Sequence, residues 1–439
     1  MSLGFGVVQL DVTIVNTATN SIGTSLGGGV AALQWTVTTY TIAFAALILT
    51  AGALGDRIGA KTIFMIGFAI FTGASLACAL APGITTLIAA RALQGIGAAL
   101  LVPNSLSLLN HAYPQEKARG RAVGIWAAGA SLALTAGPLA GGALIALLGW
   151  RSIFLVNLPV GLGGMWLTWR YVHETARASA RKLDLVGQTT AIGALGCLAA
   201  ASIEGGVHGW SNPWVLTGFA GAASLAAAFV VQERRSRQPM LPLSLFTNRL
   251  FALTSMIGLL VNAAFYGLIF VLSLYFQKID GWSALATGLA FVPMMGAVLP
   301  LNLIAARAAE RWGAPIVIAS GTLLAAAGCI ALLGIERDTS YWALCAQLFA
   351  IGAGLGLVVP PLTSALLGSV DKPRSGIAAG VLNSTRQTGS VLGVAVFGSL
   401  VARPDGFVRG AHVALIISAV LLVSAAVMIS AGGHARDRT

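Results

Sequence analysis

Residues 52–61 read GALGDRIGAK, and a shorter related stretch, AERWG, occupies residues 309–313. Matching Gly55 to Ala309 sets the two stretches 254 positions apart. Further matches follow in the same order at separations of 255 or 256 positions: IGA at 96–98 and 351–353, the Gly-xxx-Gly pairs at 120–124 and 376–380, and Gly137 with Gly393. A repeat that keeps its order along the chain predicts two halves with the same architecture.

The composition predicts that both halves lie in a membrane. Hydrophobic residues make up 57% of the 439 residues and charged residues only 9%, whereas a soluble domain carries about 25% charged residues. The apolar residues form repeated runs of about 20 residues, which is the length of a membrane-spanning helix. Helices are expected because a spanning segment must satisfy its backbone hydrogen bonds internally.

The separation of the repeats predicts more than twelve spans. Six helices with short loops need roughly 200 residues, and the excess of about 55 accommodates two inserted helices. We therefore predict an all-α integral membrane protein with a six-helix bundle at 1–172, an inserted pair within 173–248 and a second bundle at 249–439. The fourteen predicted spans are 3–19, 35–54, 62–80, 84–109, 121–148, 151–171, 185–204, 213–232, 250–276, 284–305, 314–335, 341–367, 376–400 and 411–431.

The distribution of Lys and Arg predicts the orientation. If the N-terminus is cytoplasmic, 19 of the 26 basic residues fall on the cytoplasmic side, five fall outside, and Arg91 and Arg386 lie within spans. Basic residues stay on the cytoplasmic side, so we expect a multi-pass protein of the bacterial inner membrane with both termini in the cytoplasm. Because the charges lie in separate loops, the net charge of +12 does not indicate nucleic-acid binding. No basic residue precedes the first span, which suggests a shortened N-terminus.

Three segments resemble motifs of one transporter family. The 52–61 stretch resembles the signature loop between helices 2 and 3 of the major facilitator superfamily. Residues 91–95, RALQG, resemble its helix 4 motif, and Gly129 with residues 137–142, GPLAGG, resembles its helix 5 antiporter motif. The resemblance implies the major facilitator fold, two bundles related by an axis along the membrane normal with a substrate site between them.

Two further segments narrow the resemblance. Residues 10–16, LDVTIVN, and 150–159, WRSIFLVNLP, look like segments of the 14-span drug:proton antiporter family, and within it the chain is most similar to methylenomycin A resistance proteins. Two positions depart from the superfamily pattern: Ala60 stands where a basic residue is frequent, and Glu310 replaces Asp in the second copy. Neither departure changes the expected fold.

The resemblance implies roles for two groups of residues. It implies a conformational latch that stabilises the outward-facing state, formed by Gly52, Gly55, Asp56, Arg57, Gly59 and Lys61. It also implies an antiporter motif formed by Gly129, Gly137, Pro138, Gly141 and Gly142. From chemistry alone, Asp56 can cap a helix or pair with a base, and Pro138 breaks one helical hydrogen bond. A simple topogenic turn and ordinary helix packing remain the respective alternatives.

Asp11 carries the chemistry that we expect inside the membrane. It lies about ten residues into the first span, roughly 15 Å deep. A bare carboxylate there is costly, so it must face a cavity, find a partner or hold a proton. Arg91 is the only basic residue deep in the first six predicted spans and lies within reach. We predict that both residues couple transport to protons; the alternatives are a static ion pair and, for Asp11, direct substrate contact.

The sequence also offers candidates for a substrate pocket. Aromatic residues and one buried cation are its candidates, although aromatics also anchor helices at the membrane interface. Arg386 attracts an anionic or electron-rich substrate in one interpretation and bonds to backbone carbonyls in the other. The candidates are Trp35, Tyr40, Trp126, Tyr266 and Arg386.

Several other classes are excluded. The four cysteines form no CxxC pair, the five histidines lack metal-ligand spacing, and no phosphate-binding loop is present. We therefore expect no enzyme activity, metal or cofactor, and no ATP-driven transport. The sequence predicts a proton-coupled efflux antiporter for a small hydrophobic drug or antibiotic, working as a monomer with substrate, protons and lipid as its partners. The alternative is a proton-linked or facilitated metabolite importer.

Overall fold

The computed structural model describes residues 1–113, 115–175, 184–236, 238–335, 340–371, 375–403 and 406–433. Within these ranges every regular element is a helix, which confirms the all-α prediction. Contacts divide the chain into two compact units, Met1–Leu198 with Thr217–Leu241 and Ala199–Leu216 with Pro242–Thr439. The domain limits expected from the sequence, at 172/173 and 248/249, stay a prediction. Arg436 and Arg438 of the expected cytoplasmic tail lie outside the described residues.

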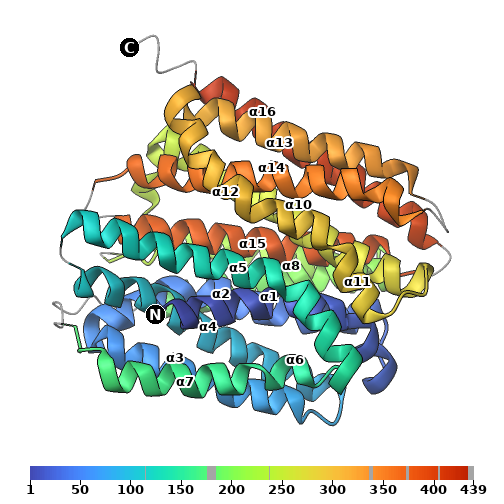
Figure 1. Cartoon of the computed structure of the whole chain (residues 1–439), viewed down its shortest axis with the longest axis horizontal. Helices are drawn as coiled ribbons and strands as arrows, with labels where there is room; N and C mark the ends of the chain where they lie inside the picture. The colour runs from blue at the N-terminus through green and yellow to red at the C-terminus, as the bar shows by residue number, and fades with distance from the viewer. Residues whose placement is uncertain are drawn as a thin grey trace. The chain divides into compact units, whose positions relative to one another are not determined.

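The first unit is a bundle of long helices (Figure 1). Within it α1 packs along α5, while α2 and α3 both pack against α4, and α7 lies against α3. α8 and α9 each contribute only part of their length to this unit. The helices are α1 (Ser2–Leu26), α2 (Val30–Ile58), α3 (Ala60–Ala79), α4 (Ile84–Ala112), α5 (Glu116–Leu148), α6 (Ser152–Leu155), α7 (Asn157–Tyr171), α8 (Leu185–His208) and α9 (Pro213–Arg235).

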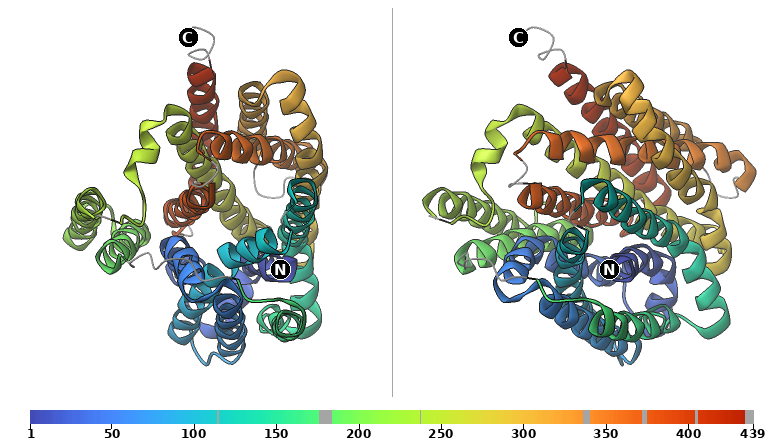
Figure 2. Two further views of the ribbon diagram at one scale, coloured as in Figure 1. Left: turned by 90° about the vertical axis from the view of Figure 1, so that its left-hand side faces the viewer. Right: turned by 60° about the vertical axis from the view of Figure 1, so that its left-hand side comes forward.

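The second unit, coloured from yellow to red in Figure 2, is also a bundle of helices, and its contacts repeat the packing of the first unit. Here α10 packs along α15, while α12 and α13 both pack against α14, so the internal repeat of the sequence is also a repeat of helix pairs. The elements are η1 (Leu243–Thr247), α10 (Arg249–Leu274), the π-helical η2 (Tyr275–Ile279), α11 (Ala284–Ala290), α12 (Val292–Trp312), α13 (Ala314–Ala331), η3 (Leu332–Gly334), α14 (Tyr341–Gly368), α15 (Ser375–Leu400) and α16 (Phe407–Gly433).

The stretch expected to be a loop at 52–61 is almost entirely helical. α2 continues to Ile58 and α3 begins at Ala60, so that only Gly59 separates them. Gly59 has φ 117° and Gly313, its counterpart between α12 and α13, has φ 87°. Such values favour glycine because a Cβ would be strained there. The N–H groups of Gly59 and Gly313 both donate to the carbonyl four residues earlier at 2.9 Å, so the repeat extends to the backbone.

Twelve helices among the described residues are long and apolar enough to cross a membrane. α1 and α15, with 25 and 26 residues, are long enough but are not among them. Both helices carry polar side chains in their middle turns: Asp11 and Asn16 in α1, and Arg386 and Gln387 in α15. The chain is therefore a multi-pass membrane protein with about twelve apolar helices, and the count of fourteen spans is not confirmed.

The predicted span at 151–171 is interrupted once. α6 ends at Leu155 and α7 begins at Asn157, with Val156 between them still in a helical conformation (φ −59°, ψ −25°). Pro159 explains the weak point, since it has no N–H to bond the carbonyl of Leu155. The interruption leaves Asn157 as the first residue of α7.

Candidate functional site

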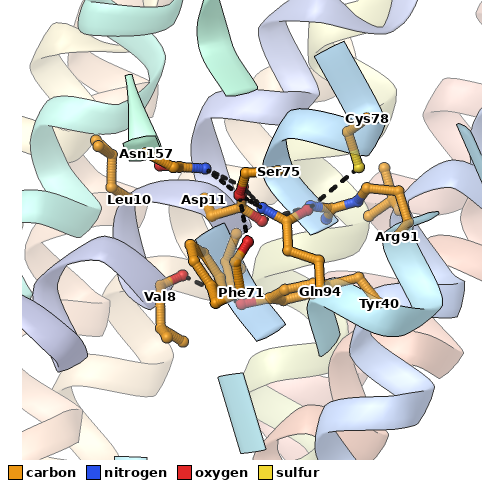
Figure 3. A network of polar contacts seen from close by, with 12 residues as sticks. Val8, Leu10, Asp11, Tyr40, Phe71, Ser75, Cys78, Arg91, Gln94 and Asn157 are labelled. Carbon is orange, nitrogen blue, oxygen red and sulfur yellow. Dashed lines mark hydrogen bonds and ion pairs between the residues drawn. The ribbon is translucent and has the colours of Figure 1, made fainter. Parts of the chain in front are cut away.

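The side chain of Asp11 is fully buried in the first unit, with 0% exposed. Its Oδ2 accepts a hydrogen bond from Arg91 Nη1, and the two groups form an ion pair. Its Oδ1 accepts from Gln94 Nε2 at 2.7 Å and from Asn157 Nδ2 at 3.1 Å. All three partners of this carboxylate are donors, as an ionised acid in lipid requires. Figure 3 shows these side chains converging from α1, α4 and α7.

Arg91 is equally buried, with 1% of its side chain exposed. Besides Asp11, its Nη1 donates to Gln94 Oε1 at 2.6 Å, and its Nε donates to the backbone carbonyl of Thr36 in α2 at 3.1 Å. Its guanidinium carbon lies 4.2 Å from the centroid of the Tyr40 ring, a favourable arrangement for a cation over an aromatic face. The guanidinium carbon also lies 5.9 Å from the centroid of the Phe154 ring, so the buried cation is held by one charge, two oxygens and two aromatic rings.

A second layer of polar groups surrounds the ion pair. Ser75 Oγ of α3 accepts from Gln94 Nε2 at 2.9 Å and from Asn157 Nδ2 at 3.3 Å, and it donates to the carbonyl of Phe71 at 2.7 Å. Cys78 Sγ donates to Gln94 Oε1 at 3.7 Å. Four helices thereby contribute to one hydrogen-bonded cluster, which we call the Asp11 cluster: Asp11, Ser75, Cys78, Arg91, Gln94 and Asn157.

The predicted pairing of Asp11 with Arg91 is found in the structure, but the other four members of the cluster, Ser75, Cys78, Gln94 and Asn157, were not predicted as site residues. Gln94 and Asn157 occur within quoted motif segments, 91–95 and 150–159. Gln94 follows Arg91 by three positions and so lies on the same helix face. That spacing was a usable signal. Asn157 and Ser75 had none, because the phase of a largely apolar helix does not reveal which of its faces meets α1.

The helix 5 motif packs directly against α1. Pro138 has no N–H, which leaves the carbonyl of Leu134 without its helical donor. The Thr13 hydroxyl donates to that carbonyl at 3.0 Å. A Cβ on Gly137 would overlap Thr13, and one on Gly141 would overlap Thr17. The motif therefore lets α5 lie against α1 two residues from Asp11. Gly142 is also buried, and a Cβ on Gly129 would meet nothing closer than 3.8 Å.

The residues predicted to form a latch lie at the junction of α2 and α3. Gly55 is buried against the Asn104 side chain of α4, whereas Asp56 and Arg57 are exposed. A Cβ on Gly52 would lie 3.7 Å from the Cβ of Pro103, so Gly52 packs beside α4. Lys61 Nζ donates to the carbonyl of Trp169 at 3.3 Å.

The backbone N–H groups at the N-terminus of α3 donate to side chains that the sequence did not single out. Glu174 accepts from the backbone N–H of Lys61 at 2.8 Å, and the Thr175 hydroxyl accepts from the N–H of Ala60 at 3.0 Å. Both residues follow the end of α7. The junction at Gly59 is therefore held by the segment after α7.

The predicted pocket residues fall in both units. In the first, Trp35 is half-buried, and Trp126 stacks on Phe5 with centroids 4.3 Å apart. Tyr40 belongs with Arg91, as described above. In the second, Tyr266 is buried, while Arg386 is half-buried and its Nη2 donates to Thr363 Oγ1 at 3.0 Å.

Arg386 differs from Arg91 in its charge environment. Its Nε is buried without a hydrogen-bond partner, and no ion pair to it exists among the described residues. Clusters of three or more His, Cys, Asp or Glu residues able to hold a metal are likewise absent from the part of the chain that the structure describes.

A helical bundle that repeats within the chain and carries a buried ion pair is typical of secondary transporters. The chain belongs to the Major Facilitator Superfamily, whose model matches residues 1–394. The solved human organic anion transporter MFSD10 (TETRAN) shares the fold, with a TM-score of 0.65 over 97% of this chain and 98% of that one, at 16% identity.

Two of the curated relatives are named as resistance proteins. The methylenomycin A resistance protein of Streptomyces coelicolor is 38% identical over 416 residues, which cover 95% of this chain and 87% of the relative. The multidrug resistance protein Stp of Mycobacterium tuberculosis is 38% identical over 400 residues, which cover 91% of this chain and 74% of that protein. The predicted resemblance to methylenomycin A resistance proteins is thus confirmed.

Proposed function

We propose that the chain is a proton-coupled antiporter that exports a small hydrophobic drug or antibiotic by alternating access. In this proposal it crosses the bacterial inner membrane fourteen times, keeps both termini in the cytoplasm and works as a monomer. The fully buried Asp11–Arg91 pair carries the proposal. A buried ion pair is an expensive way to hold two helices together, and ionisable groups inside membrane segments mark ion pathways.

Protonation of Asp11 changes the balance of charge in the cluster. With Asp11 ionised, Arg91 is neutralised by a direct ion pair. With Asp11 protonated, Arg91 keeps only neutral oxygens, Gln94 Oε1 and the Thr36 carbonyl. The buried net charge then rises by one, which favours a conformation in which Arg91 meets water or another partner. The proton thus biases the equilibrium between inward-facing and outward-facing states.

The available energy is sufficient. A difference of one pH unit is worth about 1.4 kcal/mol per proton, and 100 mV across the membrane adds about 2.3 kcal/mol per charge. A hundredfold substrate gradient costs about 2.7 kcal/mol. One proton per cycle therefore sustains export of a neutral compound.

Residues outside the Asp11 cluster have separate roles in the proposed transport cycle. The close packing of α5 on α1 at Gly137 and Gly141 lets α5 bend with α1 when the cluster changes. The 52–61 stretch acts as the latch of the outward-facing state. Arg386 and Tyr266 contribute to the substrate pocket, because a half-buried guanidinium with an unpaired Nε attracts an anionic or electron-rich group.

Transport into everted membrane vesicles tests the proposal. Cells expressing the chain are first screened for resistance to a panel of hydrophobic antibiotics, and a compound to which they are resistant is then used in radiolabelled form. Acidifying the vesicle interior should drive uptake of this compound, and a protonophore should stop it. Release from the vesicles under the same gradient would support the importer instead, and uptake insensitive to the protonophore would refute proton coupling.

A further inference from the structure

The carboxylate of Asp11 is surrounded by hydrogen-bond donors, which suit its ionised form but not its protonated form. Arg91 Nη1, Gln94 Nε2 and Asn157 Nδ2 all point hydrogens at it. A protonated carboxyl brings a hydroxyl that needs an acceptor, and a buried donor without one costs free energy. In the present arrangement none of the three neighbouring groups offers an oxygen to it.

The cluster contains one unused acceptor. Asn157 Oδ1 is buried and has no hydrogen-bond partner among the described residues. The corresponding oxygen of Gln94 is occupied, since it accepts from Arg91 Nη1 at 2.6 Å and from Cys78 Sγ at 3.7 Å. Ser75 Oγ already accepts from both amides. Protonation adds one donor to the cluster, and the amide of Asn157 holds the one free oxygen.

We propose that Asn157 is the positioning residue for proton coupling, and that its side-chain amide rotates by a half turn when Asp11 is protonated. Its Nδ2 donates to Asp11 Oδ1 in the ionised state, as Figure 3 shows. Its Oδ1 accepts from the Asp11 hydroxyl in the protonated state. The amide group is suited to this exchange because its two ends have opposite hydrogen-bonding roles and nearly the same shape. This inference rests on the proposed function.

The rotation breaks some hydrogen bonds of the Asn157 amide and forms another. Turning the amide gives up the bonds from Nδ2 to Asp11 Oδ1 and to Ser75 Oγ. It gains a bond to the new hydroxyl and removes an unpaired carbonyl. The other titratable or charged groups around Asp11 are Arg91 of α4, Cys78 of α3 and Tyr40 of α2. Gln94 is held at both ends of its amide, so only Asn157 is free to respond.

Infrared difference spectroscopy on the purified full-length protein in lipid tests the rotation directly. Between neutral and acidic pH, the side-chain amide C=O band of Asn157 should move to lower frequency, because its oxygen gains a hydrogen bond as the Asp11 carboxyl band appears. The amide band should be absent in Asn157→Ser, which assigns it. An Asp11 carboxyl band without any accompanying shift of the amide band would overturn the inference.

Transport gives an independent readout. Asn157→Leu removes the acceptor while keeping a side chain branched at Cγ, and proton-driven uptake into everted vesicles should fall about tenfold, on the order of one buried hydrogen bond. Asn157→Ser retains a group that both donates and accepts and should restore part of it. Thr72→Val is the matched control, since its buried hydroxyl lies beside α7 at Gly161 without a partner. Its rate and pH profile should equal those of the wild type.

The outcomes separate this inference from the proposed function. If Asp11→Asn abolishes proton-driven transport while Asn157→Leu transports with the wild-type rate and pH profile, the rotation is wrong and the antiporter stands. If the infrared spectrum shows no carboxyl band that Asp11→Asn removes, the proton site itself is wrong. If Asn157→Leu does not fold, the amide band of the wild type, assigned with Asn157→Ser, still decides.

Discussion

Glu174 Oε2 accepts two hydrogen bonds from Thr62, one from its backbone N–H at 3.0 Å and one from its hydroxyl at 2.6 Å. Glu174 follows α7, and Thr62 lies in the first turn of α3. A carboxylate at a helix N-terminus satisfies orphan N–H groups and opposes the positive end of the helix dipole. One side chain therefore joins the end of α7 to the junction between α2 and α3, next to Gly59.

Removing this cap should destabilise the first unit slightly. Glu174→Ala is expected to lower the free energy of unfolding by about 0.5–1 kcal/mol, the low end of the range for helix caps, because Glu174 is exposed and water screens its charge. Thermal unfolding of the purified protein in detergent measures this. Glu204→Ala is a suitable comparison, since Glu204 forms an exposed pair with His208, and it should lower the melting temperature less. An equal loss in both variants would contradict the cap.

The effect of Glu174 should also depend on pH. Burial raises the pKa of Glu174, but hydrogen bonds from Thr62 and from the backbone N–H groups of Thr175 and Lys61 outweigh it, so the pKa lies below its ordinary value of 4.5. A pKa that falls on folding stabilises the folded state above the unfolded pKa, and this is lost as the pH drops through the folded value. The difference in melting temperature between wild type and Glu174→Gln should therefore shrink below about pH 4.5. A difference that grows on acidification would contradict the assignment.

Thr13 should matter for the packing of α1 on α5. Thr13→Val leaves the carbonyl of Leu134 unpaired beside Pro138, and we expect a loss of about 1 kcal/mol in unfolding free energy. The hydroxyl of Thr24 bonds only within its own helix at an exposed position, so Thr24→Val serves as the control with little change. If both variants have the melting temperature of the wild type, the Thr13 hydroxyl does not stabilise the packing of α1 on α5.

Arg386 should influence substrate affinity through its charge. If its guanidinium contacts an anionic or electron-rich group, Arg386→Gln should raise the KM for transport about tenfold, on the order of one charge-assisted hydrogen bond. Arg386→Lys keeps the charge but not the fork of donors and should lie in between. Arg403→Gln, at an exposed position, is the control. An unchanged KM with a lower melting temperature would assign Arg386 a structural role instead.

The sequence predicted the pairing of Asp11 with Arg91 because depth along two spanning helices can be counted in residues. It also predicted the two related halves, because Gly59 and Gly313 stand at equivalent positions in the repeat. The remaining partners required knowledge of helix phase. Apolar residues on every face of these helices hide the side that packs, so Ser75 and Asn157 carried no periodic signal.

The local sequence also did not reveal where α2 ends or which side chains cap α3. The 52–61 stretch was predicted as a loop because it resembles the signature loop between helices 2 and 3 of the superfamily, yet α2 runs through it to Ile58. Asp56 was a candidate cap on local grounds, whereas Glu174 and Thr175 bond the first turn of α3. Caps supplied from about 110 residues away leave no trace in neighbouring sequence.

Proton-driven transport by Asp11→Asn in proteoliposomes tests the central claim most directly. The amide of asparagine keeps the size of the side chain but cannot take up and release a proton. A pH gradient should therefore no longer drive accumulation of the substrate. Exchange of labelled for unlabelled substrate across the membrane, at equal pH on both sides, should persist and show that the variant is folded. Accumulation by Asp11→Asn at the wild-type level under the same pH gradient would contradict the account.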